Sequence, residues 1–166
     1  MTTRSRNAAK VALALVVVAS VWACRKPNEF PDEPRLVFKS FELFGDSASL
    51  TVSFTDGDGD IGLDPSDNAP PFDTSSVYYF NFFVEHFQRI NGVWEQVEFD
   101  LPLYYRIPRI TPTGQNKVLE GDIALAIDPF PLFITGASDT VRYSVRMVDR
   151  ALHESNTVET DEIIID

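Results

Sequence analysis

The sequence predicts an all-β fold, an immunoglobulin-like antiparallel β-sandwich of seven or eight strands. β-branched and aromatic residues recur in alternating runs after residue 34, a pattern typical of half-buried strands. No stretch of this region keeps a 3.6-residue apolar periodicity free of proline, which argues against long amphipathic helices. Residues 35–166 also suit one domain with a single core.

The first 23 residues are expected to be a signal peptide. Arg4, Arg6 and Lys10 precede an apolar run that ends before Cys24, Arg25 and Lys26, which is the order of such leaders. The run is shorter than the roughly 20 apolar residues that a membrane-spanning helix needs. The leader therefore predicts export rather than a permanent transmembrane anchor.

The sequence Val21-Trp22-Ala23-Cys24 resembles the lipobox of bacterial lipoproteins, although Trp22 is bulkier than the small residue usual at that position. The resemblance implies that Cys24, the only cysteine of the chain, becomes the lipidated first residue and attaches the protein to a membrane. Several acyl chains would make that attachment stable. The alternative is cleavage by an ordinary signal peptidase, which would release a soluble protein.

Residues 24–34 are expected to form a short, stiff tether. They read C-R-K-P-N-E-F-P-D-E-P, with three prolines and five charges, which disfavours both a helix and a paired strand. The domain is expected to begin at residue 35.

Eight segments of the domain are expected to be strands of a Greek-key sandwich. Asn91-Gly92 lies between two of them and predicts a type I′ hairpin, because both residues tolerate a positive φ. Prolines at 70, 71, 108, 112, 129 and 131 mark loops or edges, since proline cannot donate to a ladder. The expected strands are residues 35–43, 49–55, 77–90, 93–99, 103–110, 118–128, 140–149 and 157–165.

Residues 141–156 resemble the last hairpin of immunoglobulin-like and fibronectin-type domains, in which a tyrosine-bearing strand leads into an aspartate-containing loop. Period-two alternation independently places Val141, Tyr143, Val145 and Met147 on one face. With the lipobox and the acidic segment 53–63, the chain resembles the immunoglobulin-like lipoproteins of Bacteroidetes. That resemblance implies a place in the bacterial cell envelope, with the outer membrane expected, and implies no activity.

Charge and motifs limit the classes of function. A net charge of −11 lacks the basic surface that nucleic acid requires, so no nucleic-acid partner is expected. Neither G-x-S-x-G nor H-E-x-x-H occurs, and His86 and His153 have no ligand spacing. We therefore expect no enzyme but a lipoprotein that binds or scaffolds a protein or glycan partner. The alternative is a small hydrolytic or glycan-recognising domain that uses the surface carboxylates Glu85, Glu95 and Glu98.

Aromatic residues occupy both faces of the expected strand 77–90. One face must line the core, and the other, with Tyr79, Phe83 and Phe87, is a candidate binding face, because exposed apolar patches often mark interaction sites. The alternative is that long loops cover this face.

Asp56-Gly57-Asp58-Gly59-Asp60 predicts a calcium site. Three carboxylates at alternate positions repel one another, and a hard cation with six to eight oxygen ligands would neutralise them. The segment is not an EF-hand, because Ile61 stands where that loop needs glycine. Calcium-binding cadherin-like domains suggest Asp64 and Asp149 as further ligands. The alternative is a solvated acidic turn with Ile61 and Leu63 in the core.

Overall fold

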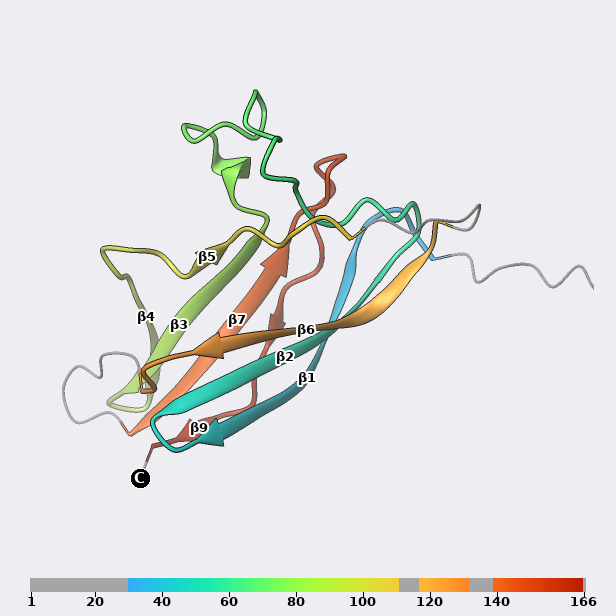
Figure 1. Cartoon of the computed structure of the whole chain (residues 1–166). Coiled ribbons are helices and arrows are strands. Elements are labelled where there is room, and N and C mark those ends of the chain that lie inside the picture. The colour runs from blue at the N-terminus through green and yellow to red at the C-terminus, as the bar shows by residue number, and fades with distance from the viewer. Residues whose placement is uncertain (1–29, 111–116, 132–138, 166) are drawn as a thin grey trace, which may run out of the picture.

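The computed structural model describes residues 30–110, 117–131 and 139–165, which form a two-layer antiparallel sandwich (Figure 1). The expected signal peptide, Cys24 and the first part of the expected tether lie outside these residues. The described part of the chain holds no helix long and apolar enough to cross a membrane.

One layer is a three-stranded sheet in the order β1-β2-β6. It consists of β1 (Arg35–Phe44), β2 (Ser47–Asp56) and β6 (Leu119–Ile127). β2 pairs along its whole length, from Ala48 opposite Ile127 to Asp56 opposite Leu119. The continuous ladder therefore fixes the position of Asp56, the last residue of β2.

The second layer has the order β4-β3-β7-β8, with β5 also paired to β3 and β9 to β7. Its strands are β3 (Phe82–Ile90), β4 (Val93–Val97), β5 (Tyr104–Tyr105), β7 (Thr140–Met147), β8 (Val158–Glu159) and β9 (Ile163–Ile164). Because the chain passes from β2 to β3, back from β5 to β6 and again to β7, its strands alternate between the sheets as in a Greek key. This confirms the predicted immunoglobulin-like sandwich.

The core lies between the two sheets and follows the period-two pattern. Val141, Tyr143, Val145 and Met147 of β7 are all buried, as their alternation predicted. They meet Leu50, Val52 and Phe54 of β2 in one cluster. Burial of each such side chain contributes about 1.5–3 kcal/mol, so the sandwich needs no disulfide.

The hairpin at residues 91 and 92 is confirmed. Asn91 has a φ of 52° and Gly92 a φ of 82°, the left-handed pair that a type I′ turn requires. Ile90 faces Val93 across it.

Three expected strands differ most from the structure. Residues 77–81 do not belong to β3, because Val77–Tyr79 forms a 3₁₀ turn in which the Ser76 hydroxyl accepts from the Tyr78 N–H at 3.0 Å. In the expected strand 103–110, only Tyr104 and Tyr105 pair with β3. The expected strand 157–165 is divided into β8 and β9, because the Tyr143 N–H donates to the Thr160 hydroxyl instead of to a backbone carbonyl.

The long loop after β2 and the loop after β7 lie at the same end of the sandwich, which we call the loop pole (Figure 1). β1 begins at this pole, and the described chain leaves after β9 at the opposite end. The loop pole therefore combines the acidic segment with Asp149, two residues beyond β7.

Candidate metal centre

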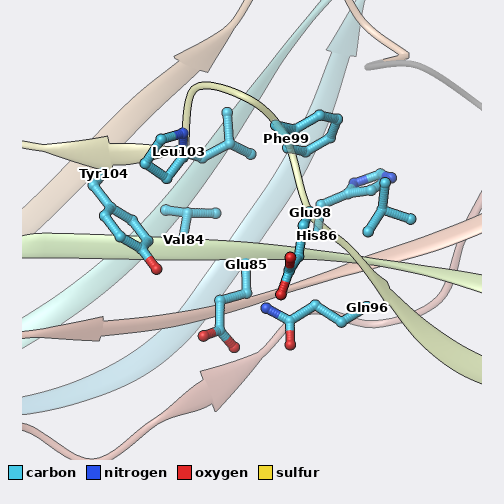
Figure 2. Close-up of a pocket in the computed structure, with 10 residues that line it drawn as sticks. Val84, Glu85, His86, Gln96, Glu98, Phe99, Leu103 and Tyr104 are labelled. Atoms are coloured by element: carbon cyan, nitrogen blue, oxygen red, sulfur yellow. The ribbon is translucent and has the colours of Figure 1, made fainter.

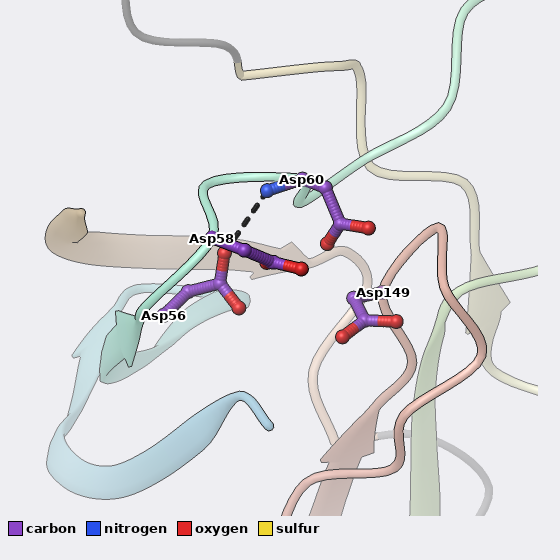
Figure 3. Close-up of side chains that lie close together, drawn as sticks. All are labelled: Asp56, Asp58, Asp60 and Asp149. Carbon is purple, nitrogen blue, oxygen red and sulfur yellow. Dashed lines mark hydrogen bonds between the residues drawn. The ribbon is translucent and has the colours of Figure 1, made fainter. Parts of the chain in front are cut away.

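Four aspartates meet at the loop pole. Asp56 ends β2, Asp58 and Asp60 follow in the loop, and Asp149 comes from the loop after β7. One carboxylate oxygen from each lies within 4.8 Å of those from the other three. Figure 3 shows the side chains facing a common space between the two loops.

Local backbone contacts curl the segment so that alternate carboxylates converge. The Asp60 N–H donates to Oδ2 of Asp56 at 3.0 Å, and Gly59 turns the chain with a φ of 71°, a conformation that favours glycine. The Arg150 N–H donates to the Asp60 carbonyl at 3.3 Å. These contacts join the two loops that supply the carboxylates.

Without a cation, four ionised carboxylates this close together would destabilise the fold. Asp56 is fully buried, and its Oδ1, like Oδ1 of Asp58 and of Asp60, has no hydrogen-bond partner among the described residues. Burial, reinforced by the neighbouring carboxylates, raises the pKa of Asp56 to about 7 and that of Asp60 to about 6. Such groups demand a proton or a cation.

His153 holds the fourth carboxylate in place. Its backbone N–H donates to Oδ1 of Asp149 at 2.8 Å, and its ring Nδ1 lies 2.9 Å from Oδ2. Burial raises the pKa of Asp149 despite these contacts. The sequence did not predict this contact, because a histidine four residues beyond an aspartate in a loop is not a recognisable motif.

The four aspartates could hold a metal ion. They offer oxygen ligands from two loops in a largely buried space, which suits a hard cation. The acidic segment and Asp149, predicted as ligands from the sequence, are thus brought together.

Asp64, also predicted as a ligand, lies apart from this group. Ile61 and Leu63 are buried as core side chains, and the Leu63 N–H donates to the Ile107 carbonyl at 2.9 Å. The chain is thereby drawn away from the cluster, and the Asp64 carboxylate pairs with Arg109 at 3.1 Å. Ile61 and Leu63 are thus buried in the core, as the alternative to a calcium site expected, and the four aspartates nevertheless cluster.

Arginine side chains lie over the three rings of the candidate binding face, two from β7 and one from the loop after β5. Phe83 is only 5% exposed, with the Arg146 guanidinium 4.1 Å from its ring centre. Arg142 lies over Phe87 at 5.3 Å. Tyr79 belongs to the 3₁₀ turn before β3, where Arg106 stacks on it at 5.1 Å. Arginines of β7 therefore lie over Phe83 and Phe87, and the loop residue Arg106 lies over Tyr79.

A pocket of about 270 Å³ lies beside β3, between the end of β4 and the start of β5. Glu85 and Glu98 line this pocket together with His86 (Figure 2), whereas Glu95 does not. Burial lowers the pKa of His86 to about 4, so the histidine is neutral near pH 7. It therefore supplies no charged partner for the two carboxylates.

Comparison of the chain with protein-family models, with curated proteins and with solved structures gave no match. The geometry alone defines the class: an immunoglobulin-like β-sandwich with a four-aspartate cluster that could hold a metal ion at its loop pole.

Proposed function

We propose that the chain is a non-catalytic lipoprotein of the bacterial cell envelope, a binding or scaffolding module whose aspartate cluster holds a structural calcium ion. The observation that carries the calcium site is the fully buried carboxylate of Asp56, whose Oδ1 has no hydrogen-bond partner in the described part of the chain and faces three further aspartates.

Calcium fits the donor set better than other common ions. All four ligands are carboxylates, whereas zinc favours histidine and cysteine. Magnesium requires near-ideal octahedral geometry and usually keeps several waters. Calcium accepts six to eight oxygens in flexible geometry, which suits four carboxylates from two loops, with backbone carbonyls or water completing the shell.

The ion would cross-link the two sheets. Asp56 ends β2 of the three-stranded sheet, and Asp149 follows β7 of the six-stranded sheet. One cation bound to both would connect the layers at the loop pole. A structural role is therefore favoured over a catalytic one.

Direct binding tests the calcium site. Calorimetric titration of the purified protein is expected to show one calcium ion per chain, and Asp58→Asn is expected to weaken its affinity at least tenfold, because a charged ligand is lost. Asp64→Asn is the matched control, since Asp64 lies in the same loop but is paired with Arg109, and its affinity should stay within twofold of wild type. If titration of the wild-type protein with calcium released or absorbed no heat of binding, the site would be contradicted.

Membrane attachment through Cys24 is tested separately. In cells fed labelled fatty acid, the wild-type protein is expected to incorporate the label and to sediment with the outer membrane. Cys24→Ser should carry no label and should leave the membrane fraction, because its only thiol is removed. An unlabelled, soluble wild-type protein would show that an ordinary signal peptidase processes the chain.

A further inference from the structure

We propose that calcium binding also fixes the junction between the domain and its tether, by clamping residues 30–36 across the two loops that carry the aspartates. We call residues 30–36 the junction segment. The inference rests on the proposed calcium site and adds a consequence to it: the ion controls how rigidly the domain is held relative to the membrane.

The first contact joins the junction segment to the loop after β2. A Cβ placed on Gly57 would press on the carbonyl oxygen of Phe30 and lie 2.6 Å from that of Pro31. The two backbones therefore touch, and only glycine allows this approach. Gly57 stands between Asp56 and Asp58, so movement of these ligands moves the surface on which residues 30 and 31 rest.

The second contact joins the junction segment to the loop after β7. The Leu36 N–H donates to Oδ1 of Asn156 at 2.9 Å, and Nδ2 of Asn156 donates to the Leu36 carbonyl at 3.0 Å. Asn156 and Asp149 belong to the same loop, which is closed on itself by the bond from the Ser155 N–H to the Met147 carbonyl at 2.9 Å. The junction segment thus contacts both ligand-bearing loops, the loop after β2 at residues 30 and 31 and the loop after β7 at Leu36.

Mutual repulsion of the carboxylates supplies the coupling. Four ionised aspartates within 4.8 Å of one another push the two loops apart when no cation joins them. A bound cation draws the loops together and stabilises the surfaces that the junction segment contacts. Because such coupling is reciprocal, loosening the segment must also weaken calcium binding.

Amide hydrogen exchange of the purified protein tests the inference. Protection of the amides in residues 30–36 is expected to increase at least tenfold when chelator is replaced by saturating calcium, and calorimetry on the same sample records whether the ion binds. Calcium uptake with unchanged protection would overturn the inference and leave the calcium site intact. A complete lack of uptake would overturn the calcium site, and the inference with it.

Two variants separate the clamp from the ligands. Gly57→Ala keeps all four aspartates but pushes against Phe30 and Pro31, and Asn156→Ala removes both bonds to Leu36. Each is expected to lower calcium affinity about tenfold and to abolish the gain in protection. Gly45→Ala lies in the turn between β1 and β2, where the added Cβ meets nothing within 4 Å but the φ of 66° strains alanine. It is the control for general destabilisation and should change neither quantity. Wild-type affinity and protection in both test variants would refute the clamp.

Discussion

Calcium at 100 times its dissociation constant is expected to raise the melting temperature of the purified domain by on the order of 10 °C. A ligand that binds only the folded state contributes about 2.7 kcal/mol at that concentration, and each kcal/mol shifts the melting temperature by a few degrees in a domain of this size. Differential scanning calorimetry in calcium and in chelator measures the shift.

The variant Asp58→Ala should abolish this response. Its carboxylate is one of the four that converge, so its removal weakens the site while relieving repulsion in the ion-free protein. The variant is therefore expected to be as stable as wild type in chelator, or more stable, and to gain nothing from calcium. Identical wild-type melting curves with and without calcium would refute a structural ion.

The direction of the pH dependence follows from the raised pKa of Asp56, about 7 in the ion-free domain against an ordinary value near 4. Between these values the folded state holds a proton that the unfolded state has released, so the ion-free domain loses stability as the pH rises towards 7. Protons and calcium compete for the same oxygens. The stabilisation by calcium should therefore be larger at pH 8 than at pH 6.

Burial of His86 is expected to destabilise the folded state as the pH falls from 6.5 to 4, and this loss opposes the gain that the raised pKa values of Asp56 and Asp60 give the ion-free domain. This side chain is 1% exposed, and burial lowers its pKa from 6.5 to about 4. Between these two pH values, His86 binds a proton in the unfolded state but not in the folded state. Its contribution to the stability of the fold is therefore present above pH 6.5 and is lost as the pH falls towards 4. The loss amounts to about 3 kcal/mol.

Urea unfolding of His86→Leu at pH 7 and at pH 4.5 measures this effect. Between the two pH values, the stability of the variant should shift by about 2.5 kcal/mol in the favourable direction relative to wild type, because the aspartate contributions are common to both proteins and cancel. His153→Leu is the control of opposite sign, since its partner Asp149 raises the pKa of His153, and its removal should make the acid loss steeper. If the free energy of unfolding changed between pH 7 and pH 4.5 by the same amount in His86→Leu as in wild type, His86 would not be the cause of the change.

The sandwich was predictable wherever one residue pattern dominated. In β7, buried apolar residues alternate with Arg142 and Arg146, so periodicity alone identified the strand and its core face. Aromatic composition misled at Val77–Tyr79, because a run of β-favouring residues carries no information on the Ser76 hydroxyl that caps a turn there. Tertiary context decided that segment.

The candidate metal centre was predictable in its acidic segment and in Asp149, where charge repulsion and the expected proximity of two loops pointed to the same place. Asp64 could not be excluded beforehand, since its position depends on how Leu63 is bonded to Ile107. The support that His153 gives to Asp149 comes from within one loop but follows no recognised motif, and the close approach of Gly57 to Phe30 joins segments distant in sequence. No local pattern encodes them.

The placement of the two ends of the described chain has a mechanical consequence. β1 begins at the loop pole, and the described chain leaves after β9 at the far end (Figure 1). A force that pulls these two ends apart therefore acts along β1 and shears it against β2. In this geometry the paired residues of β1 and β2 resist the force together, instead of separating one pair after another. These pairs run from Arg35 opposite Thr55 to Phe44 opposite Ser47. The paired length of β1 and β2 therefore resists a force applied between the two ends of the described chain.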